Sequence, residues 1–168
     1  MKLAVLSETS PGERRVSASP DTVKAYVKKG LAVVVQAGAG AGAHISDEAF
    51  VAAGASIIKS DAGLKDADVV LAVRRPSDAI LKSLKKGAVV AAGLDPYGER
   101  KGLEALAKSG QSFFAMELMP RISRAQSMDI LSSQSNLAGY KAVIDAAAFF
   151  GRAFPMMMTA AGTVPPAK

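Results

Sequence analysis

The stretch Ser19–Gln36, SPDTVKAYVKKGLAVVVQ, decides the fold class of this chain. Ser19 is a typical N-cap residue, and Pro20 suits the first position of a helix, where its missing N–H needs no partner. Gly30 ends the predicted helix, because glycine readily takes the left-handed conformation that closes a helix. The run Leu31–Val35 that follows is apolar throughout, which is typical of a strand buried on both faces of a parallel sheet.

The same alternation of apolar runs and helical segments extends through the first two-thirds of the chain. The other predicted strands span residues 2–6, 55–58, 68–73, 87–92 and 112–116. Further helices are predicted after Ser46 and over residues 77–86 and 97–109. Because parallel strands need crossover connections of one hand, this pattern predicts an α/β fold with three layers and a doubly wound parallel sheet. A long helix is predicted to end near residue 150, and an extended C-terminal tail follows it.

The composition bounds the possible functions. The 168 residues are 49% hydrophobic and 21% charged, which is typical of about one globular domain. There is no Cys, which excludes disulfides, Cys nucleophiles and thiolate metal sites, and His44 is the only His. The net charge is +6, but the basic residues come as scattered pairs, so we expect no nucleic-acid partner. Neither a secretory signal nor a membrane-spanning run is evident, and we expect no bound metal.

Two pairs of arginines follow predicted strands, at the edge where ligands bind in open α/β sheets. Arg14 and Arg15 come after the first predicted strand, and Arg74 and Arg75 come after the fourth. Each pair could hold a carboxylate or phosphate, or could instead form surface ion pairs, and the sequence leaves both readings open.

A glycine-rich run, Gly38–Ala43, follows the strand that ends near Gln36. A dinucleotide-binding G-x-G-x-x-G pattern starting at Gly38 needs glycine at position 43, where Ala43 stands. We therefore interpret the run as a turn between a strand and its helix.

Charge almost disappears from the chain after Arg124. Asp129 is the one charged residue in Ala125–Tyr140, although this stretch is rich in Ser, Gln and Asn. If the stretch is one helix, a single polar stripe is formed by Gln126, Asp129, Ser133, Asn136 and Tyr140. Arg121 or Arg124 could then donate a guanidinium fork to Asp129. Such a stripe could bind a carboxamide and ribose hydroxyls, or could serve only for contact between subunits.

Three motifs carry a family resemblance. They are MPRISRAQSMD at 119–129, LSSQSNLAGY at 131–140 and TAAGTVPPAK at 159–168. All three closely resemble the NAD(H)-binding alpha subunit of proton-translocating NAD(P) transhydrogenase. The N-terminal half, with Glu13-x-Arg15-Val16 and Ser19-Pro20, is similar to the same superfamily, which includes alanine dehydrogenase.

The resemblance implies a division of the chain. Residues 1–150 would be the family's N-terminal α/β domain, which is flavodoxin-like or Rossmann-like, and residues 151–168 an interdomain or interface segment. An NAD-binding Rossmann domain would follow beyond this chain, so that the chain alone is expected to be inactive.

The resemblance also implies a site and a reaction. Arg121, Gln126 and Asp129 would be the catalytic residues, on a loop that reaches over the nicotinamide. The implied cofactor contacts are Arg121, Ser123, Arg124, Gln126, Asp129 and Ser132. The reaction would be direct hydride transfer from NADH to NADP⁺, coupled to proton translocation, with NADP(H) held on a partner subunit. A homodimer and membrane-spanning partner subunits are implied too, which would place the protein in the bacterial cytoplasm, peripheral to the inner membrane.

Two departures separate this chain from alanine dehydrogenases. Those enzymes carry Lys at the position of Arg74 and a catalytic His after the fifth strand, where Ala92–Tyr97 contains no His. The resemblance therefore favours a transhydrogenase over the substrate lobe of an amino-acid dehydrogenase. A non-catalytic dimerisation or docking module is the remaining alternative.

Overall fold

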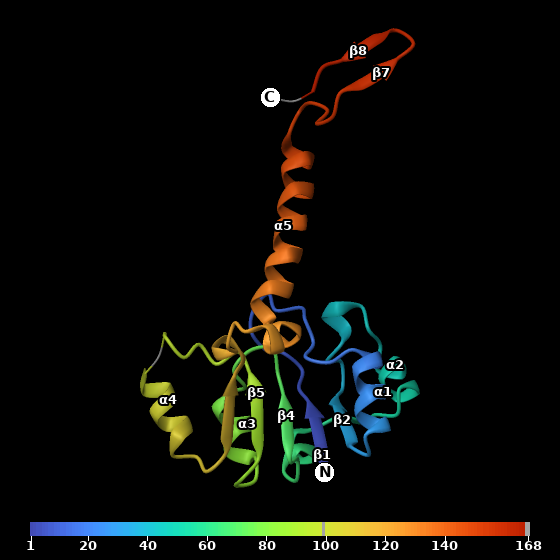
Figure 1. Ribbon diagram of the computed structural model, residues 1–168. Helices are drawn as coiled ribbons and strands as arrows, with labels where there is room; N and C mark the ends of the chain where they lie inside the picture. Colours follow the sequence, from blue (N-terminus) through green and yellow to red (C-terminus); the bar gives the residue numbers. More distant parts are fainter. Residues whose placement is uncertain (99, 167–168) are drawn as a thin grey trace. The chain divides into compact units, whose positions relative to one another are not determined.

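The computed structural model describes residues 1–98 and 100–166, and these divide into two compact units on either side of the peptide bond between Met119 and Pro120 (Figure 1). The division expected after residue 150 stays a prediction, and the last two residues of the expected segment 151–168 lie outside the described residues. Among the described residues, no helix combines the length and the hydrophobicity that crossing a bilayer requires.

Six parallel strands of the first unit form one sheet in the order β3-β2-β1-β4-β5-β6. Their bounds are β1 Lys2–Val5, β2 Ala32–Gln36, β3 Ser56–Ile58, β4 Val69–Leu71, β5 Val89–Ala92 and β6 Ser112–Ala115. The strand order reverses between β1 and β4, whose paired residues include Val5 and Leu71. At such a reversal the carboxyl ends of the two strands diverge into a crevice, which is where doubly wound sheets bind ligands.

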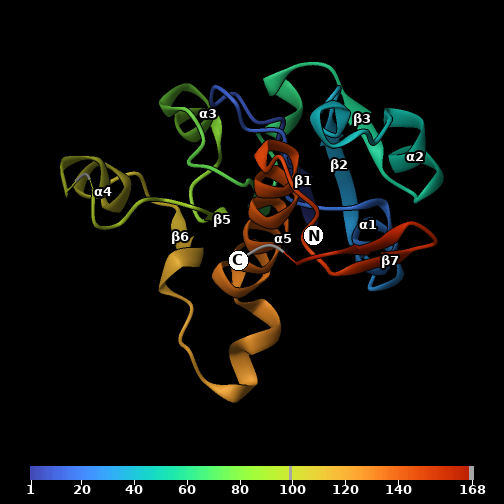
Figure 2. The ribbon, with the colours of Figure 1, turned by 90° about the horizontal axis from the view of Figure 1, so that it is seen from above.

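Helices cover both faces of this sheet. The α-helices of the first unit are α1 Pro20–Lys28, α2 Asp47–Ala52, α3 Asp78–Ser83 and α4 Arg100–Ala107. Short 3₁₀ helices span Ala41–Ala43, Asp61–Leu64 and Met116–Leu118. In the views of Figures 1 and 2, α1 and α2 lie beside β2, and α4 lies beside β5 and β6.

Alternate side chains of the strands enter two separate cores. Val5 of β1 is buried in the core that Phe50 of α2 completes. Its neighbour Ala4 joins the opposite core, together with Leu81 of α3 and Leu106 of α4. Because successive side chains of a strand point to opposite faces, these cores confirm the predicted three-layer α/β fold.

Serine side chains fix where three of the helices begin. Ser19, Ser46 and Ser77 each have extended backbone, and each side-chain oxygen accepts the N–H of the residue three positions later. These are N-cap hydrogen bonds, and each is worth about 1 kcal/mol. The predictions for the starts at Ser19 and Ser46 are therefore confirmed.

The second unit contains the 3₁₀ helix Ser123–Met128, the helix α5 Ile130–Phe149, and an antiparallel hairpin of β7 Met157–Thr159 and β8 Gly162–Val164. The predicted long helix is confirmed. Within the tail, the structure forms a hairpin where the sequence predicted only an extended segment. Gly162 has φ of +133°, a conformation that few other residues adopt, and it begins β8 directly after the turn.

Candidate functional site

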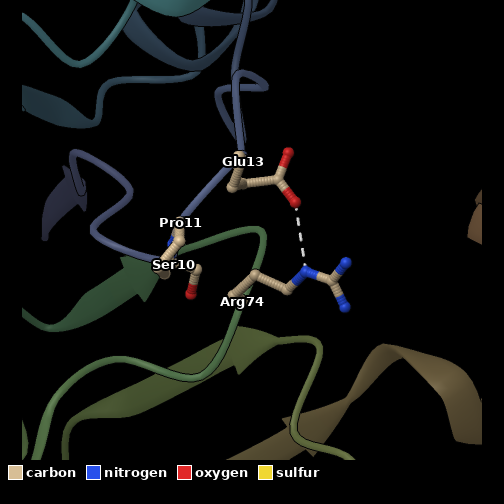
Figure 3. A pocket seen from close by; sticks show the side chains of 5 residues that line it. Ser10, Pro11, Glu13 and Arg74 are labelled. Carbon is tan, nitrogen blue, oxygen red and sulfur yellow. Dashed lines mark hydrogen bonds and ion pairs between the residues drawn. The ribbon is translucent and has the colours of Figure 1, made fainter.

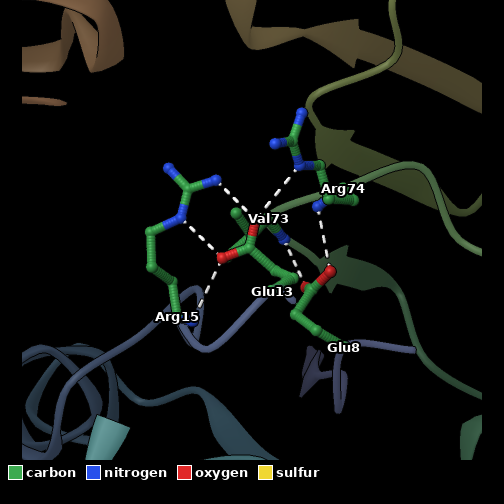
Figure 4. Close-up of polar contacts among 5 residues, drawn as sticks. All are labelled: Glu8, Glu13, Arg15, Val73 and Arg74. Atoms are coloured by element: carbon green, nitrogen blue, oxygen red, sulfur yellow. Dashed lines mark hydrogen bonds and ion pairs between the residues drawn. The ribbon is translucent and has the colours of Figure 1, made fainter. Parts of the chain in front are cut away.

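The loops after β1 and β4 meet at the point where the strand order reverses. Glu8 lies in the first loop, and its carboxylate accepts the backbone N–H groups of Val73 (2.6 Å) and Arg74 (3.1 Å) in the second (Figure 4). One carboxylate therefore ties the two loops together through hydrogen bonds to the main chain.

Glu13 makes a second connection between the same loops. Arg15 donates to its carboxylate through Nε (2.7 Å), Nη2 (2.6 Å) and the backbone N–H (3.1 Å), and Arg74 donates through Nε (3.1 Å) (Figure 4). The Glu13 side chain is only 7% exposed, whereas those of Arg15 and Arg74 are 42% and 61% exposed. The hydrogen bonds from Arg15 are the main cause that lowers the pKa of Glu13 from 4.5 to about 2. Glu13 is therefore an anion at any physiological pH.

A pocket of about 430 Å³ opens beside the ion pair of Glu13 and Arg74 (Figure 3). It is lined by Ser10, Pro11, Gly12, Glu13 and Arg74. Within the part of the chain that the structure describes, the terminal nitrogens of Arg74 have no hydrogen-bond partner, although its Nε is engaged by Glu13. Arg74 can therefore bind an anion through its terminal nitrogens, although its Nε already donates to the carboxylate of Glu13.

The structure separates the four arginines that the sequence paired. Arg15 and Arg74 meet on the carboxylate of Glu13. Arg14 instead donates to the carbonyl oxygen of Gly42 (3.2 Å), and Arg75 pairs with Asp78 (2.7 Å). Arg15 and Arg74 thus lie at the crevice, whereas Arg14 and Arg75, their neighbours in the sequence, bind nearby parts of the chain.

The glycine-rich run is a packing element. A Cβ at Gly42 would lie 2.8 Å from the carbonyl oxygen of Arg14, and one at Gly40 would lie 2.6 Å from that of Ile45. The N–H of Gly38 is already donated to the carboxylate of Asp47 (2.9 Å). These contacts support the interpretation as a turn, since the glycines are explained by close approach of the chain to itself.

The loop after β5 has its own unusual residue. Asp95 has φ of +49°, which is uncommon for a residue with a side chain, and its N–H is donated to Oε1 of Glu117 (2.8 Å). This loop is where alanine dehydrogenases were expected to carry a catalytic His. In this chain the loop carries the carboxylate of Asp95, and the carboxylate of Glu117 fixes the backbone at that residue.

The residues predicted to touch a nicotinamide lie in the second unit, at the start of α5. Asp129 is the N-cap of α5: Oδ1 accepts the N–H of Leu131 (2.9 Å), and Oδ2 accepts the hydroxyl of Ser132 (2.7 Å). The bond from Ser132, aided by the charge of Arg121, lowers the pKa of Asp129 below its ordinary value. Asp129 and Ser132 are thus brought together, and Arg121 is close enough to act on them electrostatically.

The prediction of a single polar stripe is wrong for Gln126 and Asp129, its first two residues. Gln126 lies in the 3₁₀ helix and Asp129 is extended, so neither lies on α5 with Ser133, Asn136 and Tyr140. The chain bends at Asp129 because that side chain caps the helix and so cannot be inside it. The capping preference of Asp was the signal that could have revealed this break.

Most of the other predicted contact residues point into solvent. Ser123, Arg124 and Gln126 are exposed, as is Arg121. Within the described residues, the side chains of Arg121, Arg124 and Gln126 have no hydrogen-bond partner, so neither arginine forms the expected fork with Asp129. Their roles toward a cofactor stay predictions. Across residues 1–98 and 100–166, no three His, Asp or Glu residues gather as metal ligands would.

Comparison with known proteins gives a consistent set of relatives. The family model "Alanine dehydrogenase/PNT, N-terminal domain" matches residues 4–138. An NAD(P) transhydrogenase alpha subunit of Rhodospirillum rubrum is 56% identical over 174 residues, which cover 100% of this chain and 45% of that protein. The crystal structure of transhydrogenase from Sinorhizobium meliloti superposes with a TM-score of 0.92 at 53% identity, covering 99% of this chain and 50% of that one. Alanine dehydrogenase of Mycobacterium tuberculosis is 33% identical over 140 residues, which cover 83% of this chain and 37% of that protein. This chain spans less than half the length of the curated relatives it matches.

Proposed function

The chain belongs to the alanine dehydrogenase/PNT N-terminal domain family, and on this premise we propose that it forms part of the NAD(H)-binding component of a proton-translocating NAD(P) transhydrogenase. The observation that carries the proposal is the ranking of its relatives. The transhydrogenase subunit of Rhodospirillum rubrum is 56% identical across the whole chain, whereas the alanine dehydrogenase is 33% identical across 83% of it.

The residues at the start of α5 are the proposed contacts of the nicotinamide end of NAD(H). Their side chains suit this group, because a carboxamide carries N–H donors and a carbonyl acceptor, and the set offers both acceptors and donors. Arg121 and Gln126 have polar groups without a hydrogen-bond partner among the described residues, and Asp129 with Ser132 adds an acceptor and a hydroxyl. Arg121, Gln126 and Asp129 are the proposed catalytic residues, with Ser123, Arg124 and Ser132 as further contacts.

Hydride transfer between two nicotinamides requires of the protein mainly that it position the two rings. A bound reduced nicotinamide supplies the hydride, and its transfer to a second nicotinamide needs no general acid, general base or metal. The chain's task is then to orient the ring and to exclude water from the two faces that meet. Asp129 supports this task by capping α5, which fixes where the preceding segment with Arg121 and Gln126 ends.

Partner subunits follow from the same proposal. NADP(H) would be held by a different subunit, and proton translocation would occur in membrane-spanning subunits, with this chain at the cytoplasmic face of the bacterial inner membrane. The remainder of the NAD(H) molecule would be bound by a Rossmann domain of the complete alpha subunit.

A second copy of the chain is the proposed partner of the second unit. All residues of α5 are exposed or half-buried, including Leu137, Tyr140, Val143 and Ile144, and Met156–Met158 are exposed as well. Apolar surface of this extent is typical of a protein–protein interface. Homodimerisation through this unit would bury it.

The substrate lobe of an alanine-type dehydrogenase is the second candidate, because members of that group share the family. The loop after β5 contains no His, and Arg74 stands where those enzymes were expected to carry Lys. Both differences weigh against amination of a keto acid by this chain.

The decisive experiment uses the complete alpha subunit assembled with its partner subunits. We expect Arg121→Ala and Gln126→Ala each to slow hydride transfer from NADH to an NADP⁺ analogue by roughly 10-fold to 100-fold, because misplacing a ring by about 1 Å costs this much. Circular dichroism should show an unchanged fold, and the matched control Arg152→Ala should transfer hydride at the normal rate. Unchanged rates in both test variants, or alanine-dependent formation of NADH, would refute the proposal.

A further inference from the structure

A groove of about 400 Å³ runs between α3 and α4. Its floor includes Leu84 and Leu106, which are 5% exposed each and belong to the core on this face of the sheet. Its rim is polar, and the groove has the volume of a small-molecule site.

The charge around this groove is strongly one-sided. Arg75, Lys82, Lys86 and Lys108 line it against a single acid, Asp78, which is already paired with Arg75. The lining therefore has a net charge of +3, which is half of the +6 of the whole chain. Within the described residues, none of the three lysines has an ion-pair partner. Like charges around a concave, low-dielectric surface repel one another and concentrate a positive field that an anion relieves.

The lysines differ in how firmly they are held. Lys86 packs its aliphatic stem beside Gly110, where an added Cβ would lie 3.4 Å from Cγ of Lys86. The backbone next to it is fixed by the hydrogen bond from the N–H of Gly87 to the carbonyl oxygen of Gly110 (2.7 Å). All three lysines are exposed, and no comparable contact is seen for Lys82 or Lys108 among the described residues.

Two buried polar atoms at the ends of α3 also lack partners. Gln111 donates from Nε2 to the carbonyl oxygens of Leu81 (3.1 Å) and Leu84 (3.3 Å), which fixes the orientation of its amide. Its Oε1 and the Nε of Arg75 are both buried without a hydrogen-bond partner among the described residues. Such atoms are rare in folded proteins. The Nε of Arg75 is a donor that suits a phosphate oxygen, whereas Oε1 of Gln111 is an acceptor that would need a hydroxyl or amine of the organic part of a ligand.

We infer that the α3–α4 groove binds a small organic phosphate that carries at least two negative charges. Lysine ammonium groups bind phosphate as point charges, and the guanidinium of Arg75 adds directional donors. The floor of Leu84 and Leu106 accepts the apolar body of such a molecule. The volume suits one small molecule better than a peptide helix, whose diameter with side chains is about 10 Å.

The test is a titration of the ¹⁵N-labelled chain with inorganic pyrophosphate at low ionic strength, followed by amide chemical shifts. We expect saturable shifts confined to the residues around the groove, including Lys82, Lys86, Lys108 and Gln111. The double variant Lys82→Ala/Lys108→Ala should weaken binding at least 10-fold, because two of the positive charges that face the ligand are lost.

A matched control is the double variant Lys24→Ala/Lys28→Ala, which removes two exposed charges from α1. It should change the affinity by less than 2-fold, and melting curves should show all variants folded. Equal weakening by both pairs of substitutions would overturn the inference, as would shifts spread over lysines throughout the chain. Tighter binding of a poly-glutamate peptide or of phosphatidylglycerol vesicles than of pyrophosphate at the groove would overturn it too.

Discussion

Replacing Glu13 by Gln is expected to destabilise the first unit, and to do so less at low pH. Glu13 is nearly buried and accepts hydrogen bonds from Arg15 and Arg74, so its ionised form is favoured by the folded state. Gln keeps the shape of the side chain but removes the charge, and it replaces one of the two accepting oxygens by an NH2 group that cannot accept from the arginines.

The magnitude follows from the pKa of Glu13, which falls from 4.5 in an unperturbed chain to about 2 in the folded state. This difference is equivalent to about 3 kcal/mol of stabilisation at pH 7. Because Arg15 and Arg74 are partly exposed to water, we expect the measured loss in Glu13→Gln to be about 2 to 3 kcal/mol. A carboxyl group whose pKa is lower in the folded state than in the unfolded state stabilises the folded state. Its full contribution is present at pH values above the pKa of the unfolded state. The stabilisation is lost as the pH falls from about 4.5 towards 2, and roughly half remains at pH 3.

Urea denaturation followed by circular dichroism at pH 7, 5, 4 and 3 measures this directly. The free-energy difference between the unsubstituted chain and Glu13→Gln should be constant from pH 7 to pH 5 and then narrow. Glu104→Gln is the control, because Glu104 is exposed and its one ion pair within the described residues is with exposed Arg100, so it should change stability by less than about 0.5 kcal/mol. A loss below about 1 kcal/mol at pH 7, or a difference that does not narrow at low pH, would contradict the reasoning.

Two further substitutions test other parts of the structure. Gly42→Ala should cost about 1 to 3 kcal/mol in urea denaturation, because the new Cβ would lie 2.8 Å from the Arg14 carbonyl oxygen. A Cβ at Gly151 would have no neighbour within 4 Å among the residues that the structure describes, so an equal loss in Gly151→Ala would rule out the packing argument. Asp129→Ala should lower the stability of α5 by about 1 kcal/mol in thermal melts followed at 222 nm, because the N-cap is removed. Asp145→Ala removes an exposed ion pair with Lys141 and should cost less than about 0.5 kcal/mol. A similar loss in both variants would show that the cap contributes little to stability.

The sequence was sufficient to predict the α/β class and most of the elements. Helix starts at Ser19 and Ser46 depend on a side chain and a backbone N–H three residues later, and strands such as Ala32–Gln36 depend on a run of apolar residues. These are short-range properties, so a linear chain displays them. The family resemblance was readable for the same reason, because the motif at 119–129 is contiguous.

The start of α5 shows where local reading was insufficient. Polar spacing alone suggested that Gln126 and Asp129 lie on the helix, whereas hydrogen bonds from Leu131 and Ser132 make Asp129 its cap. The spacing of polar residues predicts which side chains would share one face of a helix. It does not predict the residue at which the helix begins.

By itself, the amino-acid sequence determined the α/β class, the helix caps at Ser19 and Ser46 and the family, since the caps and the family motifs are each encoded within a short stretch of chain. Only the tertiary structure decided that Arg15 and Arg74, rather than Arg14 and Arg75, share Glu13, and that Glu8 binds the main chain at Val73. Glu13 and Arg74 are 61 residues apart and meet because β1 and β4 are neighbours in the sheet. Contacts at such separation depend on which strands pair, and strand pairing is set by the packing of the whole sheet rather than by any local segment.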